Sequence, residues 1–234
     1  MTPNLLFLPG LLEDAEVFQP LIQGLGPRAI SSVADLTRSG TIAALAKDVL
    51  AQAPAGTFAL AGHSMGGYVA LEVMRQAPER VERLALLQTN ARPDSPESTE
   101  NRRRLMALAE RDFPAVIATL MQKLLAPKHL QDAHLTGTIE SMALAIGKEA
   151  FARQQEAIIG RLDSRAFLKD IRCPTLVLAG VEDQIMPLAV LKELADGIAG
   201  ARLTVIEDCG HMAAIEQPDR VLEAFIPWLE RTTT

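Results

Sequence analysis

The sequence lacks long hydrophobic runs, an excess of basic residues and more than a few cysteines. No apolar run approaches the roughly 18 residues that a transmembrane helix needs. Lys and Arg total 23 against 29 Asp and Glu, a net charge of −6, which argues against nucleic acid or an anionic membrane as the main partner. Two cysteines, Cys173 and Cys209, are too few for a disulfide scaffold, so we expect reduced thiols and a cytoplasmic protein.

Motifs for phosphate, dinucleotide and zinc binding are missing as well. The chain has no G-x-x-x-x-G-K-[ST] run, no G-x-G-x-x-G after a strand, and no Cys/His spacing typical of zinc. Its first ten residues have neither the basic region nor the cleavage site of a signal peptide. We therefore expect a protein that uses no cofactor and no metal.

Six short apolar runs alternate with helical patterns along most of the chain. Hydrophobic residues make up 48% of the sequence, enough for a sizeable core. Short runs that are apolar on both faces predict strands buried in a parallel sheet, and the amphipathic stretches between them predict βαβ units. Ser39 or Thr41 is the expected N-cap of the first of these helices. The predicted strands are 5–8, 29–34, 58–61, 84–87, 176–179 and 203–206, and the clearest helices 42–50, 188–195 and 221–229.

Residues 93–166 break this alternation because they contain no strand pattern. They show four helical stretches punctuated by prolines, which are 101–111, 114–125, 134–146 and 149–160. The segment is too small to indicate an independent domain. We expect a helical cap inserted after the fourth strand of a single domain that spans 1–234. Insertions over the carboxyl edge of such a sheet lie where ligands bind.

A G-x-S-x-G motif at 62–66 lies between the third predicted strand and a helical pattern at 68–76. So tight a turn from strand to helix forces the serine into a strained backbone conformation, and glycines on either side relieve the crowding. The turn exposes the Ser64 hydroxyl above the sheet, at the positive end of the following helix. We predict Ser64 as a nucleophile; the alternative is a glycine-rich turn with an incidental serine.

A serine nucleophile needs a base that takes its proton. His211 follows the sixth predicted strand, at the same sheet edge as Ser64, and is the best candidate. His63 adjoins Ser64, but strand alternation points its side chain elsewhere, so we interpret it as a packing or hydrogen-bonding residue. His129 and His134 lie in the helical segment, where surface or cap positions are expected.

The imidazole in turn needs a carboxylate that fixes its tautomer and stabilises its charged form. Asp183 follows the fifth predicted strand and is the favoured acid. Glu182, its neighbour, and Asp208, which is close to His211 in sequence, remain as competitors.

An oxyanion hole is required as well, because negative charge develops on the substrate oxygen. The backbone N–H of Met65, directly after the serine, is one expected donor. The second is the N–H of Leu11, in the loop after the first strand, where Gly10 allows close approach. Alternatively, Pro9-Gly10 is merely a turn.

The order Ser64, Asp183, His211 resembles that of the α/β-hydrolase family. The G-x-x-D-x-x-x-P pattern at 180–187 and the Cys-Gly-His loop at 209–211 are similar to family patterns around the acid and the base. The resemblance covers nearly the whole chain and is greatest to small bacterial serine carboxylesterases with a helical lid, such as those that cleave pimeloyl methyl esters.

Two departures from the family pattern affect these expectations. The family often has His-Gly in the oxyanion loop, where this chain has Pro-Gly at 9–10. A backbone donor needs no histidine, so activity is still expected, with different substrate contacts. Only residues 1–4 precede the first strand, so the antiparallel pair that often begins the family is not expected. The implied fold is α/β, with about six parallel strands and helices on both faces.

The resemblance implies a hydrolase that cleaves carboxylic esters of small to medium apolar acyl groups through an acyl-enzyme on Ser64. The expected partner is a small-molecule ester, and the expected state is a monomer or a homodimer. Two other readings remain open. The same fold and catalytic residues serve C–C bond hydrolysis, perhydrolysis or lyase chemistry in similar sequences, and some relatives are small-molecule receptors.

Overall fold

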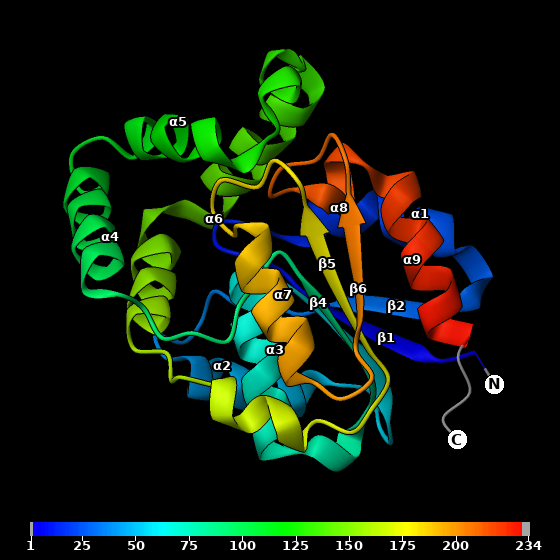
Figure 1. The fold of residues 1–234 in the computed structure, drawn as a ribbon. Helices are drawn as coiled ribbons and strands as arrows, with labels where there is room; N and C mark the ends of the chain where they lie inside the picture. The colour runs from blue at the N-terminus through cyan, green and yellow to red at the C-terminus, as the bar shows by residue number, and fades with distance from the viewer. Residues whose placement is uncertain (1, 231–234) are drawn as a thin grey trace.

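The computed structural model describes residues 2–230 and contains a six-stranded sheet with helices on both faces (Figure 1). All neighbouring strands are parallel and their order is β2-β1-β3-β4-β5-β6, which confirms the expected sheet. Of the expected domain, 1–234, residue 1 and residues 231–234 lie outside the described part. The strands are β1 (Asn4–Leu8), β2 (Ile30–Val33), β3 (Phe58–His63), β4 (Val81–Leu87), β5 (Thr175–Gly180) and β6 (Arg202–Ile206).

The position of each strand explains the strength of its sequence signal. Every residue of β3 and of β5 is buried, because these strands lie inside the sheet and have helices over both faces. The edge strand β2 alternates between exposed and half-buried residues, which is why its apolar run is the weakest. The strand order reverses beside β1, since β2 lies on one side of it and β3 on the other. The carboxyl ends of β1 and β3 therefore flank a crevice of the kind where such folds bind ligands.

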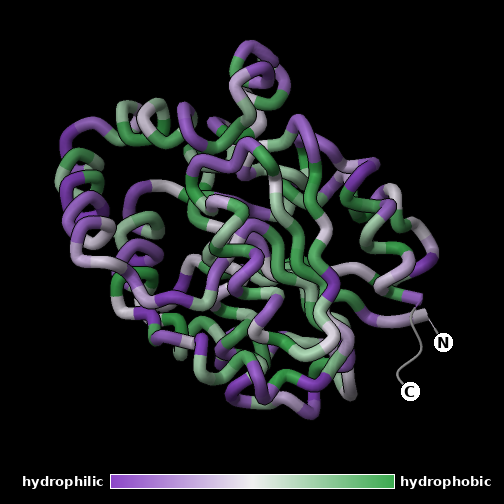
Figure 2. The backbone as a smooth tube through the Cα atoms, viewed as in Figure 1, coloured by the Kyte–Doolittle hydropathy of each residue, from purple (hydrophilic) through white to green (hydrophobic). Residues whose placement is uncertain are grey.

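Two hydrophobic clusters hold the helices onto the sheet, one on each face. Successive residues of β1 point to opposite faces, so Leu6 and Leu8 belong to one cluster and Leu5 and Phe7 to the other. Hydrophobic residues concentrate along the strands and the inner faces of the helices (Figure 2). The first cluster includes residues of α2 (Ile42–Gln52), α3 (Met65–Gln76) and α7 (Leu188–Gly197), and the second includes residues of α1 (Gln19–Leu25), α8 (Ala213–Glu216) and α9 (Pro218–Glu230).

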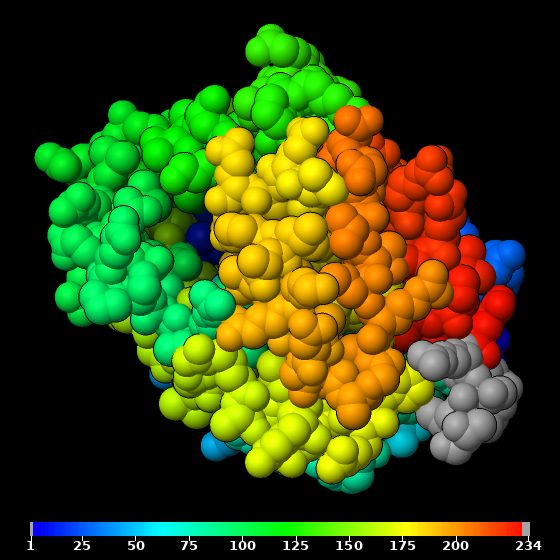
Figure 3. Space-filling model, in the orientation of Figure 1, coloured from blue at the N-terminus to red at the C-terminus, as the bar shows by residue number. Residues whose placement is uncertain are grey.

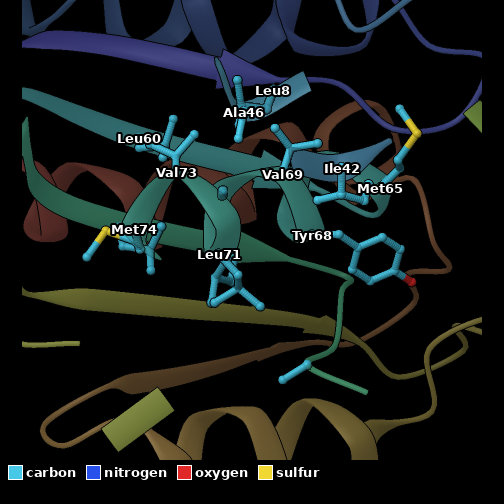
Figure 4. Packing of buried hydrophobic residues seen from close by; sticks show 14 of the residues in the cluster. Leu8, Ile42, Ala46, Leu60, Met65, Tyr68, Val69, Leu71, Val73 and Met74 are labelled. Atoms are coloured by element: carbon cyan, nitrogen blue, oxygen red, sulfur yellow. The ribbon is translucent and has the colours of Figure 1, made fainter. Parts of the chain in front are cut away.

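Helix α3 shows how this packing positions the G-x-S-x-G turn. Val69 and Val73 are fully buried and face Leu60 of β3, so the helix lies against the strand that precedes it (Figure 4). At the start of α2, Thr41 Oγ1 accepts a hydrogen bond from the backbone N–H of Ala44, 3.2 Å away, so Thr41 rather than Ser39 is the N-cap.

The segment between β4 and β5 is helical and lies beyond the carboxyl ends of the strands (Figure 1). The segment contains α4 (Pro96–Ala109), α5 (Phe113–Leu124) and α6 (Ala133–Ile159). The two predicted helices 134–146 and 149–160 are present as the two halves of α6, and they are separated by a kink at Gly147, whose φ of 79° and ψ of 167° are not helical.

Sequence patterns miss α1 and α8 because these helices have seven and four residues, too few turns to show a helical period. No helix in the described part of the chain is long and apolar enough to span a bilayer.

Candidate active site

The carboxyl edge of the sheet carries several strained backbone positions. Four residues other than glycine have positive φ within residues 2–230, and each follows a strand. They are Leu12 after β1 (62°), Ser64 after β3 (50°), Gln88 after β4 (41°) and Asp208 after β6 (54°). Such conformations are costly for residues with a Cβ, and they concentrate at functional sites.

Ser64 occupies the turn between β3 and α3, with φ 50° and ψ −114°. Its N–H donates to the carbonyl oxygen of Leu87, 2.9 Å away. Its carbonyl oxygen accepts from Thr89 Oγ1 at 2.8 Å and from the N–H of Gly67 at 3.0 Å. The bonds to Leu87 and Thr89 tie the strained turn that the motif predicts to the end of β4 and the loop after it.

Gly66 lets the first turn of α3 lie directly against the end of β1. A Cβ at this position would overlap the carbonyl oxygen of Leu8 and lie 2.7 Å from that of Pro9. The loop after β1 is thereby held beside the N-terminus of α3. Neither the N–H of Leu11 nor that of Met65 has a protein acceptor among the described residues. Two unpaired backbone donors therefore lie beside the serine.

The structure brings together three side chains that are far apart in the sequence. His211 Nε2 lies 2.9 Å from Ser64 Oγ, and His211 Nδ1 lies 2.8 Å from Asp183 Oδ2. His211 is 1% exposed and Asp183 is 6% exposed. The other carboxylate oxygen of Asp183 accepts from the N–H groups of Ile185 and Met186, each at 2.8 Å. These two bonds orient the carboxylate toward the imidazole.

The two carboxylates that competed with Asp183 in the sequence, Asp208 and Glu182, lie elsewhere in the structure. Asp208 is exposed and pairs with Lys128 at 2.8 Å, a bond that lowers the pKa of the Asp208 carboxyl. Glu182 is half-buried, and the carboxylate bonded to His211 is that of its neighbour Asp183.

A cavity of about 340 Å³ lies between this edge of the sheet and helices α4 to α6. The surface is hollowed between the segments coloured green and yellow, and atoms of the blue N-terminal part are visible at its base (Figure 3). Ser64, His211 and Leu11 all line the cavity. The lining is polar where α4, Asp94 and Gln155 of α6 contribute, and we call this part the polar wall. The rest of the lining from α5 and α6 is apolar apart from Lys123, and we call it the apolar wall.

In the described part of the chain, no group of three or more His, Cys, Asp and Glu side chains is arranged to hold a metal ion. Cys209, next to the loop of His211, is fully buried, and burial raises the pKa of its thiol. A buried thiol of raised pKa is a poor nucleophile.

Comparison with known proteins shows the family of this chain. A family model described as the alpha/beta hydrolase fold matches residues 27–218. The chain belongs to the α/β-hydrolase family. The hydrolase is 28% identical over 170 residues to a pimeloyl-[acyl-carrier protein] methyl ester esterase of Aromatoleum aromaticum. The aligned residues cover 68% of each chain. This relative confirms the resemblance expected from the sequence motifs.

Other proteins similar to the hydrolase include both a semialdehyde hydrolase and a further esterase. It is 33% identical over 173 residues to a 2-hydroxymuconate semialdehyde hydrolase of a Pseudomonas species. The aligned residues cover 69% of this chain and 58% of that enzyme. A solved thermophilic esterase from Thermogutta terrifontis, with malate bound, superposes with a TM-score of 0.89 at 30% identity and covers 97% of this chain and 89% of the other.

The hydrolase has a second buried histidine–carboxylate pair beside the first. His63 Nδ1 lies 2.8 Å from Glu13 Oε2, and His63 Nε2 donates to the carbonyl oxygen of His211 at 2.8 Å. The same Glu13 oxygen accepts from the N–H of Gly10 at 2.6 Å. Burial lowers the pKa of His63, but the Glu13 carboxylate raises it, and the net pKa lies above the usual 6.5. His63 is thus the hydrogen-bonding residue that the sequence suggests.

Glu13 itself is a residue that sequence reasoning missed. The sequence offers little signal for it, because Glu13 is one of three acidic residues, with Asp14 and Glu16, in the segment after β1. Through His63 and Gly10, its carboxylate connects the loop after β1 to the backbone of His211.

Glu216 is a further buried carboxylate of the hydrolase that the sequence did not indicate. One oxygen accepts from the N–H groups of Gly210 and Met212, each at 3.0 Å. The other accepts from the N–H of Ala126 and contacts His129 Nδ1, each at 2.8 Å. Glu216 therefore fixes both flanks of the His211 loop and attaches them to the segment after α5.

Proposed function

We propose that the hydrolase is a serine carboxylesterase acting on esters with small to medium apolar acyl groups. The observation that carries the proposal is the continuous hydrogen-bonded chain from Ser64 Oγ through His211 to Asp183, with distances of 2.9 and 2.8 Å. This arrangement has the geometry that general-base activation of a serine requires.

In the acylation step, Ser64 Oγ attacks the ester carbonyl carbon while His211 Nε2 takes its proton. Asp183 holds the Nδ1–H tautomer and stabilises the imidazolium. The N–H groups of Leu11 and Met65 donate to the oxygen that becomes negative. The intermediate collapses when His211 gives its proton to the leaving alcohol, and the acyl group remains on Ser64.

In the deacylation step, water takes the place of the alcohol. His211 Nε2 removes a proton from water as the water oxygen attacks the acyl carbon. Collapse of the second intermediate breaks the bond to Ser64 Oγ, which regains a proton from His211, and the carboxylic acid is released.

Residues 93–166 act in this proposal as a cap that shapes the pocket. Helices α5 and α6 supply the apolar wall of the cavity that contains Ser64. That wall favours an apolar group on one side of the scissile bond.

The test is hydrolysis of 4-nitrophenyl butyrate by the wild type, by Ser64→Ala and by Asp183→Asn. Asp208→Asn is the matched control, because Asp208 is an exposed carboxylate of the neighbouring loop. We expect loss of turnover in the first two variants, normal turnover in the control, and labelling of wild-type Ser64 by a fluorophosphonate. Equal rates for wild type and Ser64→Ala would overturn the proposal.

Hydrolysis of a C–C bond is the second candidate, favoured by the 33% identity to the 2-hydroxymuconate semialdehyde hydrolase. The same serine and histidine would serve, with a carbon leaving group in place of an alcohol. Turnover of a vinylogous diketone, with none of simple 4-nitrophenyl esters, would favour this candidate over the esterase.

A further inference from the structure

The polar wall of the cavity points to a carboxylate-binding subsite formed by Arg102 and Gln155. The inference rests on the proposed esterase function and revises its substrate class, from esters of purely apolar acyl groups to esters whose acyl group carries a free carboxylate away from the scissile bond. Both residues line the cavity that contains Ser64.

The charges that face the cavity favour an anion. Of the acidic groups, Glu13 is paired with His63, and Asp94 is shared between two guanidinium groups. One carboxylate against two guanidinium groups leaves positive charge in the wall, although the whole chain is acidic. The titratable side chains that line the cavity are Glu13, Tyr68, Asp94, Arg102, Lys123, Arg161 and His211.

Asp94 holds this arrangement in place. Its side chain is 1% exposed and accepts from Arg161 Nη1 at 2.6 Å, from Arg102 Nε at 3.3 Å and from Thr99 Oγ1 at 2.9 Å. Burial raises the pKa of Asp94, but the bonds to the two arginines outweigh that effect and lower it. The carboxylate therefore stays ionised and orients both guanidinium groups.

Gln155 supplies the observation that points to a ligand. Its side chain is fully buried, and its Oε1 accepts from Arg102 Nη1 at 2.8 Å. This bond fixes which end of the amide faces the arginine. Within residues 2–230, the opposite end, Nε2, has no hydrogen-bond acceptor. A buried N–H group without a partner is costly, and a ligand oxygen at this wall would satisfy it.

The ligand class follows from these donors. A guanidinium group beside an amide N–H matches the planar, two-oxygen geometry of a carboxylate. The apolar wall contains Ile117, Leu120, Leu124, Ile139, Met142 and Ala143, with Lys123 as the one charged side chain among them. A monoester of a short dicarboxylic acid fits both walls, with its carboxylate at Arg102 and its apolar alcohol against α5 and α6.

The test compares two esters of equal chain length, 4-nitrophenyl hydrogen glutarate and 4-nitrophenyl pentanoate. Wild type should show roughly tenfold or greater kcat/KM for the glutarate ester. Arg102→Gln should abolish this ratio. Gln155→Glu should abolish it too, because the new carboxylate pairs with Arg102 and repels the ligand. Arg104→Gln is the control, since Arg104 lies on the same helix but is exposed and pairs with Glu100.

Binding of glutarate to Ser64→Ala, measured by calorimetry, separates the subsite from the chemistry. Binding that disappears when Arg102→Gln is added supports the subsite, even if no ester is hydrolysed and the esterase proposal fails. The subsite is refuted if the wild type hydrolyses both esters without preferring the anionic one, if glutarate does not bind Ser64→Ala, or if both Arg102→Gln and Gln155→Glu, folded by circular dichroism, retain the preference. Any of these outcomes would mean that the hydrogen bond between Arg102 and Gln155 serves only to join α4 to α6.

Discussion

Replacing Glu216 by glutamine tests how firmly the His211 loop is held. In the best orientation, the glutamine oxygen keeps its bonds from the N–H groups of Gly210 and Met212. The new NH₂ group then faces the N–H of Ala126, and two donors oppose each other. His129 can adapt by moving its proton to the other ring nitrogen.

The magnitude follows from these contacts. A buried N–H that loses its acceptor costs about 1–3 kcal/mol, and the remaining bonds weaken because the acceptor is no longer charged. Together these effects lower the free energy of unfolding by roughly 2–4 kcal/mol. For a chain of this length, that corresponds to a fall in Tm of about 4–8 °C. Because Gly210 and Met212 flank His211, we expect kcat to fall as well.

The assay is urea and thermal unfolding of wild type, Glu216→Gln and a control, Glu223→Gln. Glu223 lies on α9 and forms an exposed ion pair with Arg220, so its replacement should leave stability unchanged. Equal unfolding free energies for Glu216→Gln and Glu223→Gln would show that the buried carboxylate does not hold the loop.

Three further predictions concern the same edge of the sheet. Gly66→Ala introduces a Cβ that overlaps the carbonyl of Leu8, so we expect a large loss of soluble, folded protein, and an unchanged melting curve would contradict the close approach. Asp183→Asn, which removes the partner of His211 Nδ1, should lower kcat roughly 10³–10⁴-fold with little change in fold; near-normal turnover would exclude Asp183 as the acid. Because the pKa of His63 is raised, its pair with Glu13 stabilises the fold fully below about pH 6.5 and less as pH rises through the native pKa. Urea titrations should show this fall in wild type and not in Glu13→Gln, and parallel pH profiles would refute it.

Local patterns predicted most of the fold. Each strand is a short run whose apolar character follows from burial on both faces, and all six are where those runs lie. The absence of strand patterns indicated the helical segment between β4 and β5, and the break between its last two predicted helices corresponds to the kink at Gly147. Helices α1 and α8 were not predicted, because a helix of one or two turns is too short to show a helical hydrophobic period.

The sequence by itself determined all six strands, most of the helices and the strained turn at Ser64, because burial pattern, strand-to-helix spacing and glycine placement are properties of neighbouring residues. Tertiary structure alone decided that Asp183, and not Asp208, meets His211, and that Glu13 and Glu216 brace the surrounding loops. These contacts join loops that follow different strands. Their distances depend on strand order, register and crossing helices, and no periodic pattern along one segment contains that information.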